Sequence, residues 1–202
     1  MAQQPDAGAA LRAAAERGDT AEIVRLSRAG APIDARDGAG RTALLIAVDR
    51  DRLDAARALM EAGASINAQA QNLDTPWLLA GARGRAAMLE LMLERGPDLT
   101  IRNRYGGNAL IPACERAHVE AVRVLLRSRI DVDHVNNLGW TCLLEIVILG
   151  DGGPRHVEVT RLVLAAGANP NIADKEGVRP LQHARRRGQA EVARLIAAAG
   201  GR

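Results

Sequence analysis

Small apolar residues recur along this chain at a fixed interval. Ala14, Ala47, Ala80 and Ala113 lie 33 residues apart, and a 71-residue interval leads on to Ala184. A period of this length is typical of a solenoid, in which stacked supersecondary units each contact their neighbours. Large apolar residues and glycines recur at the same interval: Leu11, Leu44, Trp77, Leu110, Leu143 and Leu181, and Gly30, Gly63, Gly96, Gly167 and Gly200.

Each period predicts one pair of short helices. In residues 37–48, polar and glycine residues form a turn, and Thr42 then stands at a helix N-cap, where its hydroxyl accepts an orphan backbone N–H. A second helix is predicted from about Leu53 to Ala62, and it ends at Gly63, which suits a left-handed C-terminal cap. The unit is therefore turn, helix, short loop, helix and glycine.

Two segments resemble the signature of the ankyrin repeat, Thr-Pro-Leu-His-x-Ala: Thr-Pro-Trp-Leu-Leu-Ala at 75–80 and Arg-Pro-Leu-Gln-His-Ala at 179–184. Residues 63–68 and 167–172 resemble the closing loop of that family. The resemblance implies an all-α ankyrin-repeat solenoid of about six helix-turn-helix repeats with short β-turn or hairpin loops, capped by its first and last repeats. We expect a single domain over residues 1–202, with repeats at about 9–36, 37–69, 70–102, 103–135, 136–173 and 174–200.

A narrower resemblance is to small bacterial ankyrin-repeat proteins. It is carried by residues 103–113, by residues 138–145 and by an insert at 150–156. Members of that group often carry an export signal and have no assigned enzymatic activity. The chain has no apolar run near the ~20 residues that a membrane span requires. Because residues 1–6 look like a mature N-terminus with an added Met, we expect a cytoplasmic protein as the chain stands, and a periplasmic one if a signal peptide was removed.

Composition fits closely packed helical pairs. Phe is absent, and the aromatic residues are Trp77, Trp140 and Tyr105. The net charge of +3 does not indicate a general polyanion binder. Cys114 falls within one first helix and Cys142 at the start of the next, and this stagger predicts free thiols rather than a disulfide.

The histidines do not form a metal site in the sequence. His118 and His156 stand at equivalent places at the start of two second helices, not at the i, i+4 spacing of a helical zinc site. His134 lies in a closing loop, and the family resemblance gives His183 a structural role as a hydrogen-bonding group between neighbouring turns. There is no Ser/His/Asp grouping, phosphate loop or paired carboxylate motif. We expect no metal, no cofactor and no enzymatic activity.

Two aromatic residues lie on predicted turns. Trp140 and Tyr105 belong to adjacent turns, whereas Trp77 replaces a core leucine and is expected to be buried. Exposed aromatics are typical of binding hot spots. The alternative is that each ring packs on the neighbouring turn, and the sequence leaves both open.

Departures from the repeat gather in the fourth and fifth units. Ile146 replaces the recurrent alanine, Arg129 replaces the recurrent glycine, and residues 151–155 are inserted between two helices. Because Arg in a left-handed cap costs on the order of 1 kcal/mol, we expect another loop shape at Arg129. The insert is expected to lengthen the first helix or to hang over the binding groove. A functional centre and drift of a tolerant repeat both explain the cluster.

An arginine ends the first helix of most units. We name this set the arginine ladder: Arg17, Arg50, Arg83, Arg116 and Arg187. A cation in the last turn of a helix is stabilised by the helix dipole, by roughly 0.3–1 kcal/mol. The same positions, by family resemblance, line a concave surface.

We therefore expect a monomeric, non-enzymatic protein–protein interaction module. It binds a protein or peptide with an acidic segment through its concave groove and turn tips. The alternative is an anionic ligand, a polyanion or nucleic acid bound on the arginine ladder. The candidate partner-binding residues are Arg50, Arg83, Arg102, Arg104, Tyr105, Arg116, Asn137 and Trp140.

Overall fold

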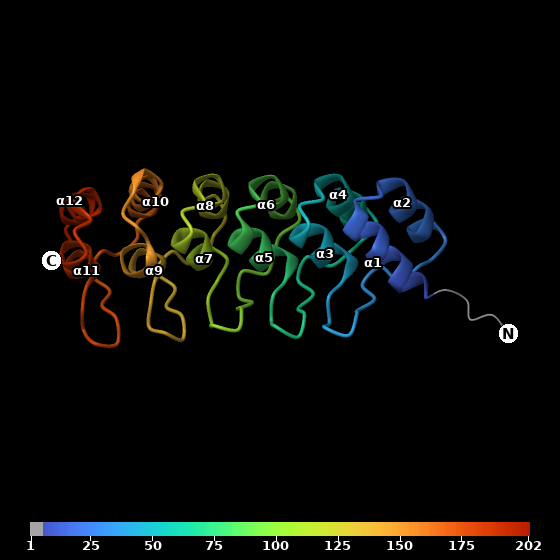
Figure 1. Cartoon of the computed structure of the whole chain (residues 1–202), viewed down its shortest axis with the longest axis horizontal. Helices are drawn as coiled ribbons and strands as arrows, with labels where there is room; N and C mark the ends of the chain where they lie inside the picture. The colour runs from blue at the N-terminus through green and yellow to red at the C-terminus, as the bar shows by residue number, and fades with distance from the viewer. Residues whose placement is uncertain (1–5) are drawn as a thin grey trace. The chain divides into compact units, whose positions relative to one another are not determined.

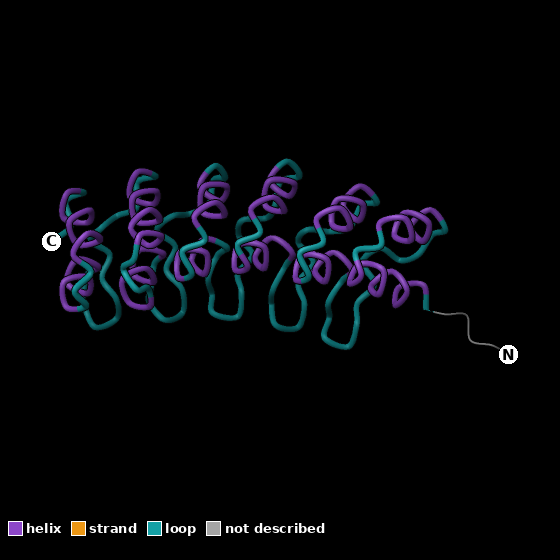
Figure 2. Tube along the Cα trace, turned by 45° about the horizontal axis from the view of Figure 1, so that its top comes forward, coloured by secondary structure: helices purple, strands orange, loops and turns teal. Residues whose placement is uncertain are grey.

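The computed structural model describes residues 6–202, and over this range it contains helices and loops but no strand (Figures 1 and 2). This confirms the all-α repeat fold. The helices are α1 (Ala7–Arg17), α2 (Thr20–Arg28), α3 (Ala43–Asp49), α4 (Leu53–Glu61), α5 (Pro76–Arg83), α6 (Ala86–Leu93), α7 (Leu110–Glu115), α8 (Val119–Leu126), α9 (Cys142–Leu149), α10 (Pro154–Ala165), α11 (Pro180–Arg186) and α12 (Ala190–Ala198).

The chain divides into two compact units. The first comprises the residues up to Ala80 together with Ala87–Asp98, and the second comprises Gly81–Ala86 together with Leu99–Arg202. In the first unit, α1 packs on α3 and α2 on α4, so first helices form one layer and second helices another. In the second unit, α7, α9 and α11 form one layer, and α8, α10 and α12 form the other. The expectation of one domain over the whole chain stays a prediction.

Side-chain caps start the first helices. The hydroxyl of Thr42 accepts the N–H of Leu45 at 3.2 Å, which confirms Thr42 as an N-cap. Thr141 caps α9 in the same way. Before α7 the N-cap residue is Ala109, and Asn108 stands at the position equivalent to Thr42, where its Oδ1 accepts the N–H of Leu110. In these three helices the polar side chain thus satisfies backbone groups that the helix leaves unpaired. Arg179, which precedes α11, makes no such side-chain bond, and its backbone N–H donates to Oε1 of Gln182 instead.

The second helices end as the glycine pattern indicates, with one exception. Helix α4 ends at Glu61, and Gly63 follows with a φ of 91°. Arg129 avoids the left-handed region, and α8 ends at Leu126. There the hydroxyl of Ser128 donates to the carbonyl of Leu125 and accepts the N–H of Ile130. The prediction of another loop shape at Arg129 is confirmed, and Ser128 provides the capping contacts.

The recurrent apolar positions form the core. The periodic alanines are fully buried, and Ile146, which replaces one of them, is buried as well. Trp77 is 2% exposed, which confirms it as a core residue. Burying such a side chain stabilises the fold by a few kcal/mol, roughly 25 cal/mol for each Å² of apolar surface.

The insert lengthens a second helix instead of the first one. Helix α9 has 8 residues, whereas α10 has 12 and begins at Pro154. Proline suits the first position of a helix because its missing N–H has no intrahelical partner there. The expectation that the insert extends the first helix is therefore wrong.

Cys114 and Cys142 form a disulfide, so the expectation of free thiols is also wrong. Their Cα atoms are 5.6 Å apart, which is a normal bridging distance. Stacking of successive first helices in exact register would hold the two cysteines apart. Instead, the fifth residue of one first helix abuts the start of the next, as the close approach of Gly81 to Ala109 shows for the preceding pair.

Candidate functional site

In the turns that begin the repeats, an Asp or Asn side chain accepts hydrogen bonds from backbone N–H groups. In the fifth repeat, Oδ1 of Asn136 accepts the N–H groups of Leu138 and Trp140, both at 3.0 Å. Asn103 accepts two backbone N–H groups in the same way in the fourth repeat. These bonds are typical of Asx turns, in which the side chain imitates a backbone turn. The tips therefore have defined conformations.

Hydrogen bonds join consecutive turns in the second unit. The N–H of Asn137 donates to the carbonyl of Tyr105 at 2.9 Å. Lys175, in the turn of the sixth repeat, donates from Nζ to the carbonyl of Asn137 at 2.6 Å. We call Arg104, Tyr105, Leu138, Trp140 and Lys175 the turn surface.

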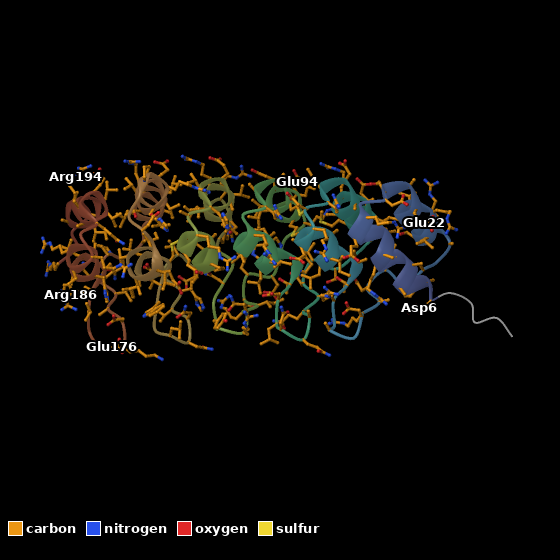
Figure 3. All side chains as sticks on the ribbon, viewed as in Figure 1. Asp6, Glu22, Glu94, Glu176, Arg186 and Arg194 are labelled. Atoms are coloured by element: carbon orange, nitrogen blue, oxygen red, sulfur yellow. A yellow bond between two sulfur atoms is a disulfide. The ribbon has the colours of Figure 1, made fainter. Side chains whose placement is uncertain are left out.

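The turn surface exposes apolar side chains. Tyr105 is 51% exposed and Leu138, at the equivalent position one repeat later, is 48% exposed. The guanidinium of Arg104 lies 4.7 Å from the centroid of the Tyr105 ring, a cation–π arrangement. Trp140 is half-buried. In the last turn, the position equivalent to Leu138 is occupied by Glu176, at the tip of the turn (Figure 3).

The arginine ladder makes contacts within the fold. Arg50 donates to Oε1 of Glu16 at 3.1 and 2.7 Å, and Arg116 donates to the carbonyl of Ala82 at 3.2 Å. Each of these arginines therefore reaches the first helix of the preceding repeat. All ladder residues stand at the last or capping position of a first helix. In the fifth repeat this place is taken by Leu149, which is 49% exposed.

The remaining candidates differ in their surroundings. Arg83 is exposed at the end of α5. Arg102 folds back on its own loop, where it donates to the carbonyls of Leu99 and Ile101. The structure thus brings Arg104, Tyr105, Asn137 and Trp140 together on adjacent turns, but Arg102 has a local structural contact.

The insert is fastened by His156, which sequence reasoning did not single out for this role. Its Nδ1 lies 2.7 Å from Oδ1 of Asp151, and its Nε2 lies 2.9 Å from the carbonyl oxygen of Glu115. Both ring nitrogens therefore face acceptors, so neither is available as a catalytic base or metal ligand. Two hydrogen bonds to its carboxylate, from the N–H of Gly153 and from His156, lower the pKa of Asp151. An open cleft of about 240 Å³ adjoins these residues.

Glu145 is a buried acid that was also missed. It is 5% exposed on α9, and its Oε1 accepts the side-chain N–H of Asn136 at 2.9 Å. Burial, together with repulsion from Glu115, raises the pKa of Glu145 to about 7. The signal in the sequence is a single acid within the apolar run 142–149.

The sixth repeat has a histidine, His183, at the position of Glu145. Nε2 of His183 lies 2.6 Å from Oδ2 of Asp174. Asp174 belongs to the same repeat, so the contact is internal to one repeat and not between neighbouring turns. His134 similarly joins its loop to the carbonyl of Gly106 at 2.6 Å.

No group of three or more His, Cys, Asp or Glu side chains within residues 6–202 is arranged to hold a metal ion. Over the same range, none of the helices has the length and apolar character to cross a membrane. His118 lies against Gly84, and its burial lowers the pKa of its ring. The ring of His118 therefore makes a packing contact within the fold.

Comparison with known proteins shows similarity to proteins built of ankyrin repeats. A family model described as ankyrin repeats in three copies matches residues 77–172, and a single-repeat model matches residues 39–71. The putative ankyrin repeat protein YahD of Escherichia coli is 38% identical over 188 residues, which cover 93% of this chain and 94% of YahD.

Solved structures show the same likeness. The crystal structure of an ankyrin repeat domain from Acinetobacter baumannii superimposes with a TM-score of 0.91 and is 49% identical, with coverage of 95% of this chain and 98% of that one. The ankyrin repeat domain of Bcl-3, a member of the IkappaB protein family, gives a TM-score of 0.85 at 27% identity, with coverage of 96% and 86%.

Proposed function

The chain belongs to the ankyrin-repeat family, and we propose that it is a non-enzymatic module that binds a protein or a peptide. The family fold is typically an interaction scaffold without catalytic activity. Function in such a fold depends on the exposed site and not on the scaffold. The finer proposal therefore concerns the surface that makes the contact.

The turn surface is the observation that carries the proposal. It presents an aromatic, an aliphatic and a half-buried indole side chain on turns that are fixed by hydrogen bonds. Rigid, partly exposed aromatic side chains are enriched among binding hot spots because they contribute large contact areas at a low entropy cost. Tyr105, with its ring half exposed, is the principal anchor, and Trp140 supports it from the next turn.

Charge favours an acidic partner. Residues 99–202 contain 15 Lys and Arg against 10 Asp and Glu, whereas residues 1–98 contain 12 against 14. Within residues 6–202, four of the five exposed large apolar side chains lie in this more basic part, namely Tyr105, Val135, Leu138 and Leu149, and Leu73 lies in the other part. An acidic segment with apolar side chains complements such a surface, because charge complementarity speeds association and selects among partners.

The ladder contributes less than the turn surface. Arg50 and Arg116 already have partners in the preceding repeat. Their removal would cost stability as well as binding. We also propose Arg83, which is exposed, and Arg104, which lies over the Tyr105 ring, as contacts for the partner's carboxylates, because the guanidinium fork suits that geometry.

Affinity capture from the native cell extract tests this function. Tyr105→Ala and Trp140→Ala, made separately, should each weaken capture of the partner at least about fivefold if they are hot spots. Their melting temperatures should stay near that of the wild type. Leu73→Ala is the matched control, since Leu73 is also an exposed apolar residue on a turn, but in the first unit. Unchanged capture by both variants, with lowered stability, would assign the two rings to turn packing.

A further inference from the structure

The single disulfide of the described chain lies at the base of the turn surface. Cys142 is the first residue of α9 and follows Trp140 by two positions, and Cys114 lies in α7. The bond therefore ties the first helix of the fourth repeat to that of the fifth. These are the repeats whose turns carry Tyr105 and Leu138.

Other repeats make the same helix contact without a crosslink. The position of Cys114 is occupied by Gly81 in the third repeat, and its neighbour, at the position of Cys142, is Ala109. In the first two repeats the equivalent residues are Ala15 and Ala43, both buried. Contact alone thus does not require cysteines.

The fifth repeat contains a feature that opposes stable packing. Glu145 places a carboxyl group in its core, where the side chain is 5% exposed. A buried ionisable group costs stability. The disulfide therefore constrains a repeat whose core contains a buried acid.

We propose that the Cys114–Cys142 disulfide is a redox-controlled lock that holds the fourth and fifth repeats together and so fixes the turn surface. The lock is closed by thiol–disulfide exchange with an external disulfide, and its closure is retained because the bond is buried. The partner-binding role of the surface rests on the proposed function; the lock itself does not.

The closing reaction consumes one external disulfide. One cysteine, as its thiolate, attacks a sulfur of the donor and releases one donor thiolate, which leaves a mixed disulfide. The second cysteine, also as a thiolate, attacks the protein sulfur of that mixed disulfide and releases the other donor thiolate. The two cysteine thiols lose two protons and two electrons, and the donor disulfide is reduced to two thiols.

Burial makes the closed state persistent. Cys114 is 0% exposed and Cys142 is 1% exposed, so a reductant reaches neither sulfur while the repeats are packed. Exchange therefore requires that the fourth and fifth repeats open locally, since rates depend on access to the sulfur that is attacked. The redox conditions at the time of folding then determine the stiffness of this surface.

Amide hydrogen exchange on three forms of the chain tests the lock. The forms are wild type refolded with glutathione disulfide, wild type refolded with dithiothreitol, and the variant Cys114→Ala with Cys142→Ala. This variant installs alanine at both positions, as Ala15 and Ala43 stand at the equivalent positions of the first two repeats, so it removes the crosslink with residues that the repeat tolerates. Mass spectrometry after alkylation reports the thiol state of each form.

We expect residues 105–115 and 136–146 to exchange faster in the reduced form and in the alanine variant, by on the order of 100-fold, because a crosslink closing a loop of this length restricts the opened chain. Residues 7–28, in the first unit, should exchange alike in all three forms. Slow reduction of the folded oxidised protein, accelerated by urea, is the second expected result.

Equal exchange in the oxidised and reduced forms would overturn the lock. So would two alkylatable thiols in protein refolded with glutathione disulfide. The measurement needs no partner, so it is independent of the capture experiment. Faster exchange with unchanged capture would keep the lock and reject its link to binding.

Discussion

The buried carboxyl of Glu145 should make the protein less stable as pH rises through neutrality. Its pKa is about 7 in the folded protein against an ordinary value of 4.5. The folded state therefore retains a proton that the unfolded state has already lost. This stabilising contribution is fully present below about pH 4.5 and is lost as pH rises through 7. The difference between the two pKa values corresponds to about 3 kcal/mol.

Glu145→Gln removes this titration and keeps the bond from Asn136. The amide oxygen of glutamine can accept the side-chain N–H of Asn136 as Oε1 of Glu145 does now. Its own amide N–H groups need acceptors in a buried site, which costs about 1–3 kcal/mol. The decisive quantity is thus the pH dependence of the unfolding free energy, not its value at one pH.

Urea unfolding at pH 5, 6, 7 and 8, followed by circular dichroism, measures that dependence. From pH 5 to pH 8 the wild type should lose up to about 3 kcal/mol relative to Glu145→Gln. Glu94→Gln is the control, since Glu94 is exposed beside the second-helix layer (Figure 3). If wild type and Glu145→Gln lose stability in parallel over this range, the reasoning about Glu145 is wrong.

Two further substitutions have defined outcomes. His156→Ala should lower the unfolding free energy by about 1–3 kcal/mol, because it leaves the part-buried carbonyl of Glu115 without this partner. An NMR titration should show the pKa of Asp151 rising only part of the way to its ordinary value, since the bond from Gly153 remains. Gly84→Ala should destabilise the fold more than Gly188→Ala in thermal melts. Both glycines have a φ of 68°, but only at Gly84 would the new Cβ lie 2.6 Å from the His118 ring; equal losses would contradict this reasoning.

The repeat fold can be predicted from the sequence because the residues that form its core recur at one fixed interval. Thr42 and Gly63 mark the ends of helices through local backbone chemistry, and local chemistry is visible in the order of residues. Trp77 could be placed in the core because it takes the position of a leucine that is buried in every repeat.

The disulfide could not be predicted, because it depends on how two first helices cross. Cys114 and Cys142 are offset by five positions within the repeat, and only the packing of α9 on α7 brings them together. The effect of the insert was missed for a similar reason. Pro154 can begin a helix, so the added residues joined α10 and not the helix before them.

The candidate site was predicted in part. Tyr105 and Trp140 were assigned to adjacent turns from the repeat alone, and the structure places them there. Their role in binding stays a prediction. Glu145 and His156 were missed as polar contacts, because their partners, Asn136 and Asp151, become neighbours through the folding of a turn and of the insert.

The bond between α7 and α9 also changes how the chain would respond to a pulling force. Tension applied at the two ends passes through the sulfur atoms and bypasses the 27 residues between Cys114 and Cys142. At about 3.3–3.6 Å for each extended residue, roughly 90 Å of chain cannot be drawn out while the disulfide is intact. The turn of the fourth repeat, with Tyr105, precedes the bypassed segment, whereas Leu138 and Trp140 lie within it, so the disulfide protects these two residues of the turn surface from being drawn out by force.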